Sequence, residues 1–473
     1  MFKQLFFDDQ RLLLNSNLKR VYGKAEAIPE SIYIENCGAV PCDASVCKLP
    51  DGKYHLFYYV PLIKKEQDNV VKFEEGGVIL AAVSDDGIHF KPRNTAKEAG
   101  LKNPKYENQV LDYFDGEFCT AVVDKFADES ERIKLLIVEL DRDHCHAVCS
   151  IMVSPDGIHW RRKNGGCWNV YGSEMGYACY NPIREKFLIS ARPDGGDRRV
   201  VISETKDWLN FSEPLLCMQC DSVDSTLAEI YTMVPFYYDG MMLSLIWMYN
   251  TIPTQHATKF AGGTMTVQLG YSFNGVHWQR ALREDFLGTN DGEQELGFKP
   301  LMIMPGGIIR EDDGSIRIYA SATKLEHGAG FKTEGAGVVV QYRLREDGFI
   351  GLQTENDTEY AILCTRDNRW KGGELKVNIS CEDATVALYN RENELYEGYS
   401  HEDCIAFSGD SCSWTPVWKN GKRLDELTDK IVQIELKFKN GTVYSFSGEY
   451  VPMMDLESHR WQYMGFDSTR KDK

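Results

Sequence analysis

Acidic side chains at the start of several short β-rich runs are the residues of this 473-residue sequence best suited to chemistry. Asp43 precedes ASVCKLPDGKYHLFYY, Glu117 stands in DGEFCTAVVD, Glu174 in YGSEMGYACYNP and Glu229 in DSTLAEIYTMVPF. Two carboxyl groups that face each other across a bond can serve as proton donor and as base or nucleophile. The sequence therefore points to a fold that gathers the starts of these runs.

A short motif, Ser-x-Asp/Asn-Gly-x-His-aromatic, recurs between such runs. It reads VSDDGIHF at 83–90, VSPDGIHW at 153–160 and YSFNGVHW at 271–278, with a degenerate copy, ISETKDWLNFSEP, from Ile202. Asp/Asn-Gly is the preferred two-residue hairpin turn because both positions tolerate positive φ. We predict a structural hairpin staple, in which the Ser bonds turn amides and the aromatic ring covers the apolar side.

The elements that would position the acids are strands. Apolar runs joined by turns such as PDG and YDG recur, and helical periodicity is nearly absent, so we predict an all-β fold. Four-stranded units that repeat every 50–70 residues or so are typical of propeller blades. We predict an N-terminal arm at 1–30, a five-bladed β-propeller at 31–348 and a C-terminal β-sandwich at 349–473.

This layout resembles the five-bladed β-propeller glycosidases of glycoside hydrolase families 32 and 43, which include invertase, levanase and arabinanase types. It is most similar to family 32, in which a sandwich follows the propeller. The hairpin motifs, ARPDGGDRRVVISETKDWLNFSEP and KVNI…LYEGYS…FSGDS…W carry the resemblance. The sialidase Asp-box, one residue longer in spacing, is a weaker relative. The invertase strings WMNDPNG, RDP and EC do not occur in this chain as such motifs.

The resemblance implies a glycoside hydrolase for a small oligosaccharide or glycoside, with a furanoside favoured. Related enzymes place their nucleophile or base Asp where the first inner strand begins, the position of Asp43; turn capping after Pro41 is the alternative. Glu229 stands beside Ile230 and Tyr231, an apolar setting that suits a general acid. Glu174 opens the third blade and is a candidate stabilising or proton-donating carboxylate.

Further candidates would bind the substrate. They are Arg192, Arg199, Asp224, Glu117, Asp124, Glu295 and His327. An Arg on an inner strand can orient a carboxylate or hold a sugar hydroxyl, and only one among Arg192, Arg198 and Arg199 is expected to do so. The alternatives are strand-end charges, an acidic surface loop for Glu295 and a core histidine for His327. Inner-strand aromatics could stack on a sugar or fill the core.

Composition and charge argue against several classes of protein. A formal charge of −18 argues against a nucleic-acid partner, and no run is long and apolar enough for a transmembrane helix. The N-terminus lacks the apolar centre of a secretory signal, and fourteen scattered cysteines favour a reducing cytoplasm. The lone CMQC at Cys217–Cys220 leaves zinc or redox chemistry as a minor alternative. We expect no metal and no cofactor; an axial ion such as calcium and a homo-oligomer stay open.

Two rival functions remain at this level. A glycoside phosphorylase on the same scaffold would use Arg198 and Arg199 to hold phosphate, and its turnover would depend on phosphate. A non-catalytic carbohydrate-binding protein would be consistent with the missing invertase strings. Substitution of Asp43 or Glu229 would abolish turnover in an enzyme and would leave binding intact in a binding module.

Overall fold

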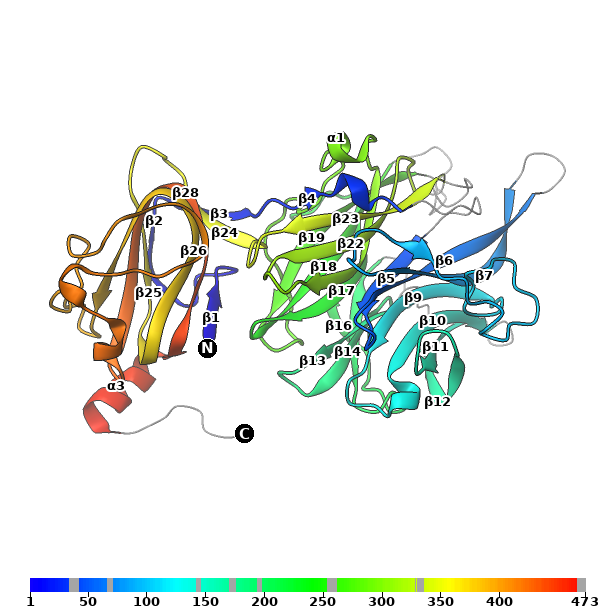
Figure 1. The fold of residues 1–473 in the computed structure, drawn as a ribbon, viewed down its shortest axis with the longest axis horizontal. Helices are drawn as coiled ribbons and strands as arrows, with labels where there is room; N and C mark the ends of the chain where they lie inside the picture. The colour runs from blue at the N-terminus through cyan, green and yellow to red at the C-terminus, as the bar shows by residue number, and fades with distance from the viewer. Residues whose placement is uncertain are drawn as a thin grey trace. The chain divides into compact units, whose positions relative to one another are not determined.

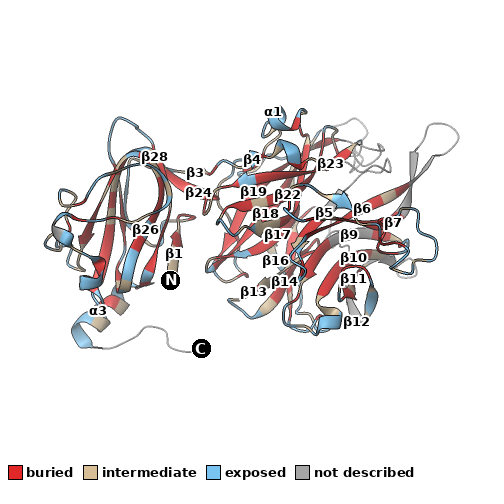
Figure 2. Cartoon of the chain, in the orientation of Figure 1, coloured by how far each residue is buried: buried red, intermediate tan, exposed pale blue. Residues whose placement is uncertain are grey.

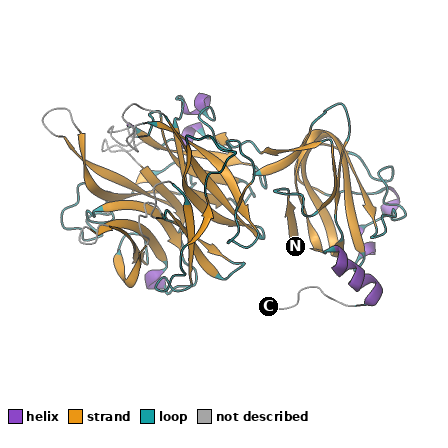
Figure 3. Ribbon diagram, turned by 180° about the vertical axis from the view of Figure 1, so that it is seen from behind, coloured by secondary structure: helices purple, strands orange, loops and turns teal. Residues whose placement is uncertain are grey.

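The computed structural model describes residues 1–33, 42–65, 71–141, 146–169, 176–193, 198–252, 262–327, 329 and 336–465. Strands make up nearly all of its regular structure (Figure 3), so the predicted all-β fold class is confirmed. The chain divides into two compact units (Figure 1): residues 25–344, and residues 1–24 together with 345–473. No helix of the described residues is long and apolar enough to cross a membrane.

Residues 25–344 form antiparallel sheets whose strands follow one another in sequence. The first sheet contains β5 (Cys42–Lys48), β6 (Tyr54–Lys65), β7 (Val71–Ser84) and β8 (Lys91–Pro92). The second contains β9 (Gly116–Val123), β10 (Ile133–Asp141), β11 (His146–Ser154) and β12 (Arg161–Asn169). The third contains β13 (Tyr177–Asn181), β14 (Lys186–Ala191), β15 (Val200–Thr205) and β16 (Leu215–Met218).

The other strands of this unit form one larger sheet with two groups. One group holds β17 (Ala228–Tyr238), β18 (Met241–Thr251), β19 (Gly263–Ser272) and β20 (Gln279–Arg280). The other holds β21 (Met302–Arg310), β22 (Ile316–Thr323), β23 (Gly337–Leu344) and β4 (Glu26–Ala27). A single parallel pairing, Met265 with Met302, links the groups. Short helices in this unit are α1 (Glu293–Leu296), η1 (Pro29–Ser31) and η2 (Glu129–Glu131).

The first strands of the groups contact one another in a cycle. β5 contacts β9, β9 contacts β13, β13 contacts β17, β17 contacts β21, and β21 contacts β5. Where β21 meets β5, a Cβ on Gly306 would lie 1.8 Å from the carbonyl oxygen of Ala44, so only glycine permits this backbone approach. A cycle of meandering sheets is typical of a propeller, and we interpret each group as one blade.

Apolar side chains pack between neighbouring groups, and the strands are buried along most of their length (Figure 2). One cluster joins Leu56 and Tyr58 of β6 to Tyr319 of β22, and another joins Leu188 of β14 to Met233 of β17. Each fully buried Leu or Met side chain contributes about 1.5–3 kcal/mol through the hydrophobic effect. The interior between blades, rather than any single sheet, therefore stabilises this unit.

The repeated motif makes the same hydrogen bonds in each copy. In the second copy, Ser154 Oγ accepts the N–H of Gly157 at 2.9 Å, and Asp156 Oδ1 accepts the N–H groups of Ile158 and His159 at 2.8 and 2.9 Å. Equivalent bonds occur at 84–89, 205–210 and 272–277. The predicted Ser-to-amide bonds are present, but positive φ at both central positions is wrong: Gly157 has φ +77° and Asp156 does not.

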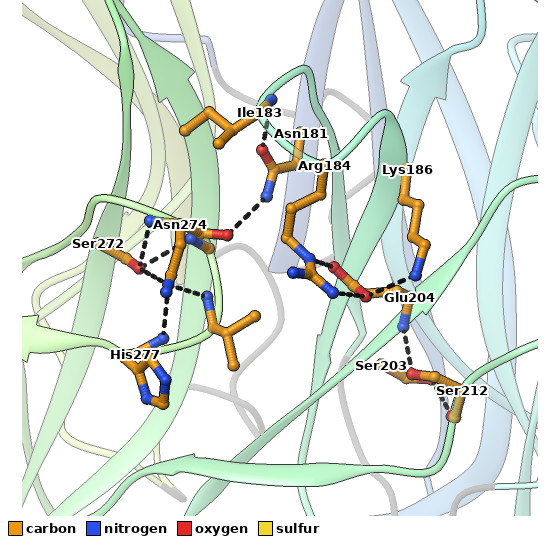
Figure 4. Close-up of polar contacts among 12 residues, drawn as sticks. Asn181, Ile183, Arg184, Lys186, Ser203, Glu204, Ser212, Ser272, Asn274 and His277 are labelled. Carbon is orange, nitrogen blue, oxygen red and sulfur yellow. Dashed lines mark hydrogen bonds and ion pairs between the residues drawn. The ribbon is translucent and has the colours of Figure 1, made fainter. Parts of the chain in front are cut away.

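Each copy lies against the preceding group. In the fourth copy, Asn181 of the third group donates to the carbonyl of Asn274 at 3.4 Å (Figure 4), and a Cβ on Gly275 would lie 2.2 Å from Asn181 Nδ2. In the first copy, Tyr319 of the last group donates to the carbonyl of Gly87 at 3.1 Å. The motif glycine therefore serves close docking between groups as well as the turn itself.

The degenerate third copy docks through a side chain. Trp208 stands at the glycine position with φ +61° and is fully buried. Its indole N–H donates to Asp124 Oδ2 of the second group at 2.9 Å, and Lys134 Nζ lies 5.5 Å from the ring centroid. A large ring thus replaces the close backbone contact of the other copies.

The other unit is also built from strands. β1 (Phe2–Leu5), β2 (Leu12–Ser16) and β3 (Leu18–Tyr22) pair with β28, β25 and β24. The later strands are β24 (Ile350–Thr354), β25 (Ala361–Thr365), β26 (Asn368–Tyr389), β27 (Phe407–Trp414) and β28 (Ile431–Pro452), with η3 (Lys419–Gly421), η4 (Leu424–Leu427) and α3 (Asp455–Met464). One core holds Phe6, Trp370 and Phe446 from beginning and end of the chain, so the first residues fold with the last.

Candidate functional site

Strand direction brings several of the predicted residues to one end of unit 25–344. In the fourth group the start of β17, the end of β18 and the start of β19 are paired neighbours, since Ala228 pairs with Asn250 and Asn250 with Thr264. Glu229 lies at this end of its group. By the same alternation Arg192 follows the end of β14, Arg198 precedes β15 and His327 follows β22.

Glu229 and Arg198 form the centre of the candidate site. Arg198 Nη1 donates to Glu229 Oε2; the Arg198 side chain is buried, whereas 27% of the Glu229 side chain is exposed. Arg198 Nε and Nη2 are buried, and no described residue accepts a hydrogen bond from them. A guanidinium orients a carboxylate, and its remaining N–H groups require acceptors once they leave water. Arg198 therefore fixes Glu229 and offers two donors to a ligand.

Aromatic rings surround this ion pair. The Arg198 guanidinium carbon lies 5.1 Å from the Tyr231 ring centroid and 5.0 Å from that of Tyr249. Arg192, also buried, lies 4.7 Å from the Tyr231 centroid and donates to the Tyr231 carbonyl at 3.2 Å. The stacked Trp247 ring extends the wall behind Tyr231. All three rings are buried, and together they form an aromatic wall that holds the two cations in place.

His327 belongs to the same wall. Its ring centroid lies 4.6 Å from that of Tyr249 and 5.6 Å from that of Tyr231. Its Nε2 is 3.5 Å from the Tyr231 hydroxyl, and its backbone N–H donates to the Gly263 carbonyl at 2.9 Å. The structure thus brings together Arg192, Glu229 and His327 from three separate groups.

Three other predicted ligands have structural partners instead. Asp124 ends β9, forms an ion pair with Lys134 at 3.0 Å and accepts the Trp208 indole N–H, far along the strand from Glu117. The Asp224 side chain is 6% exposed, is bonded to Arg280 and lies 3.2 Å from Arg283. Glu295 is exposed on α1, and Gly292, directly before this helix, lies beside Ala27 of β4. Among the described residues none of the three forms a hydrogen bond or ion pair with Glu229, although, besides burial, the charges of Asp224 and Glu229 both raise the pKa of Cys220.

The remaining predicted acids lie partly or wholly outside the described residues. Asp43 and Glu117 have backbones in β5 and β9, where the pairing of β5 shifts register between Cys42 and Ala44, but their side chains are outside the described part. Glu174 is outside it altogether. Arg199 is partly buried next to Arg198. The roles of Asp43, Glu117 and Glu174 stay predictions.

Sequence reasoning missed two members of the site. The sequence pattern gives Tyr231, whose ring both guanidinium groups approach, only as an apolar neighbour of Glu229. Arg198, by contrast, is one of the three arginines that the sequence offers as candidates. Glu326 stands directly before His327 in ATKLEHGAG and was not singled out. The consecutive glycines Gly262 and Gly263 are the one sequence feature that could have indicated this position, because two adjacent glycines allow another group to approach the backbone closely, and Glu326 lies against them.

Metal and thiol chemistry find no support in the described part of the chain. There, no three His, Cys, Asp or Glu side chains are grouped so as to hold a metal ion. Burial raises the pKa of both Cys217 and Cys220 to about 12, and neither forms a disulfide with another described cysteine. Since the thiolate is the reactive form, this CxxC is poorly suited to redox exchange.

Comparison with known proteins gives structural likeness only. No protein-family model and no curated protein matches the chain. A thermostable family-43 glycoside hydrolase has 12% identity and a TM-score of 0.47, over 68% of this chain and 95% of its own. A β-1,2-mannobiose phosphorylase from Listeria innocua has 12% identity and a TM-score of 0.46, over 74% and 98%. An N-acetylgalactosamine deacetylase from F. plautii has 13% identity and a TM-score of 0.44, over 69% and 95%. At these values the similarities do not identify the activity of this chain.

Proposed function

We propose that the chain is an enzyme that cleaves glycosidic bonds at the Glu229 end of residues 25–344. The proposal rests on a carboxylate that is accessible to a ligand, held by a guanidinium and enclosed by aromatic rings. Sugar hydroxyl groups both donate and accept hydrogen bonds, which suits a partly exposed carboxylate that is held by an arginine. A small oligosaccharide or glycoside, with a furanoside favoured, is the proposed substrate, and the cytoplasm the proposed location.

Cleavage of a glycosidic bond needs two carboxyl groups, one to protonate the leaving oxygen and one to act at the anomeric carbon or on water. Glu229 is the member of the pair whose side chain the structure describes. Asp43, at the start of β5, and Glu174 are the proposed partners by their position along the chain. Separations of about 5–5.5 Å between carboxyl groups would imply retention of configuration, and about 6.5–9.5 Å inversion.

One observation carries the proposal more than any other: Arg198 Nε and Nη2 are buried and have no hydrogen-bond partner among the described residues. Two N–H donors without partners at a buried position cost about 1–3 kcal/mol each unless a ligand supplies acceptors. Both groups belong to the guanidinium that holds Glu229, whose side chain is 27% exposed, so that an acceptor on a bound sugar would lie near the carboxylate. A purely structural ion pair would use the donors within the protein.

A panel of aryl glycosides, furanosides included, tests the proposal through phenol release. The purified full-length chain should cleave at least one of them, and Glu229→Gln should lower kcat/KM by about a thousandfold, because acid–base and covalent roles of this size are common. Glu204→Gln is the matched control: Glu204 pairs with Arg184 and with Lys186 at 3.0 Å in an outer hairpin (Figure 4). Equal activity of the two variants would reject the catalytic role of Glu229, and sugar binding without any turnover would reject the enzyme.

Phosphorolysis is the second candidate, because Arg198 and Arg192 place two guanidinium groups around one ring. The Nε and Nη2 fork of an Arg matches two oxygens of a phosphate. Turnover that requires inorganic phosphate and yields a sugar phosphate would support this candidate; equal rates with and without phosphate would support hydrolysis.

A further inference from the structure

The loop that follows β22 brings a second carboxyl group to the aromatic wall of Glu229. Glu326 is partly buried and directly precedes His327. Gly263, the first residue of β19, donates its N–H to Glu326 Oε2 at 3.4 Å and accepts the N–H of His327 at 2.9 Å. The backbone N–H of Gly263 thus bonds to Glu326 and its carbonyl group to His327, and together they hold both residues in position.

Two consecutive glycines make room for this carboxylate. Gly262 and Gly263 have φ of +153° and +124°, and a Cβ on Gly262 would lie 2.8 Å from Glu326 Oε2. The Tyr249 hydroxyl donates to the Gly262 carbonyl at 2.7 Å. The glycine pair therefore lets the Tyr249 hydroxyl and the Glu326 carboxyl group meet at the same short piece of backbone.

Glu229 and Glu326 differ in their charged partners. Glu229 accepts a hydrogen bond from Arg198, whereas no Lys, Arg or His among the described residues pairs with Glu326. Both carboxyl groups act on one neighbour: burial raises the pKa of Tyr249, and the charges of Glu229 and Glu326 act in the same direction against that of Arg198. When two carboxyl groups have different surroundings, their pKa values differ, so that one can act as the acid and the other as the base or nucleophile.

We propose that Glu326 is the proton donor to the leaving group, an inference that rests on the glycoside cleavage proposed above. The glycosidic C–O bond breaks with its electron pair going to the leaving oxygen, and that oxygen takes the proton of Glu326. Water supplies the oxygen that bonds to the anomeric carbon and the proton that restores Glu326. Glu229, which Arg198 holds as an acceptor, acts at the anomeric carbon or on the water. The acid role that the sequence suggested for Glu229 thus passes to Glu326, which takes the place of Asp43 and Glu174 as the partner of Glu229 in the catalytic pair.

Leaving-group dependence tests this role. The probes are the phenyl and the 2,4-dinitrophenyl glycoside of whichever sugar the wild-type chain cleaves. Glu326→Gln should lower kcat/KM for the phenyl glycoside by about a thousandfold, because phenolate departs poorly without a proton. The same variant should stay within about tenfold of wild type on the dinitrophenyl glycoside, whose leaving group needs no acid catalysis. Glu326→Asp keeps the carboxyl group and should recover part of the phenyl activity.

The outcomes separate this inference from the proposed function. Loss of activity on both probes alike, or on neither, overturns the assignment of Glu326 while the cleavage by the wild-type chain still stands. A wild-type chain that cleaves no aryl glycoside overturns both. Near-wild-type melting of Glu326→Gln and Glu326→Asp, checked by circular dichroism, excludes unfolding as the cause of a loss.

Discussion

The outer hairpin turns and the inner-strand ends of residues 25–344 both present acidic side chains, but their partners differ. Partial burial alone would raise the pKa of Asp156, yet N–H donors of His159 and Ile158 lower it to about 2. The N–H of Asn210 does the same for Asp207, to about 2. Glu229 instead has an Arg partner that retains open donors, and an exposed edge. An acid whose acceptors are filled by its own turn is structural; an acid beside unfilled donors is a candidate for chemistry.

Loss of the Trp208 ring should give the largest effect on the structural side of this comparison. Trp208→Ala removes a fully buried ring and its bond to Asp124, and should destabilise the unit by about 3–5 kcal/mol. Hydrogen exchange of peptides from 116–141 and 177–218 measures this loss locally. Leu209→Ala, at an exposed neighbour in the same turn, is the control. Equal protection in both variants would mean that the third motif does not dock the groups.

Arg198→Lys tests the functional side. Lysine keeps the positive charge but loses the planar fork, so kcat/KM on the cleaved aryl glycoside should fall by about a hundredfold with little change in melting temperature. Arg161→Lys, in a pair with Glu131 at an outer strand, should change neither quantity. A drop in melting temperature with unchanged kcat/KM would place Arg198 among the structural ion pairs.

Asp156→Asn should give the smallest effect, seen as a change in how the melting temperature depends on pH between pH 5 and pH 2. The carboxyl pKa of Asp156 is lower in the folded protein than in the unfolded chain, where it is about 3.9. Its contribution to stability is therefore present above about pH 4 and lost as the pH falls towards 2. The melting temperature of the wild type, measured from pH 5 to pH 2, should fall slightly more steeply than that of the variant. Parallel curves would contradict the turn bonds.

Sequence patterns predict local structure well, but they do not predict which partners a side chain meets in the folded protein. Strand and turn patterns predict the all-β class, and the start of a strand such as that at Glu229 can be found from its apolar run. What a carboxylate binds is a tertiary property: Asp124 and Glu229 both stand at ends of inner strands, yet one meets Lys134 and Trp208 and the other Arg198. The adjacent residues Arg198 and Arg199 likewise differ in burial, the first being buried and the second only partly so. The sequence gives no local signal for Glu326, because the residues that accommodate its carboxyl group, Gly262 and Gly263, are distant from it in the sequence.

The central claim is that Arg198 and Glu229 bind the substrate, and a crystal structure with the sugar bound tests it most directly. The account predicts a sugar oxygen within about 2.7–3.2 Å of Arg198 Nε or Nη2, with the anomeric carbon beside Glu229. A sugar bound in residues 345–465 or on an outer hairpin, with the Arg198 edge still empty, would contradict it.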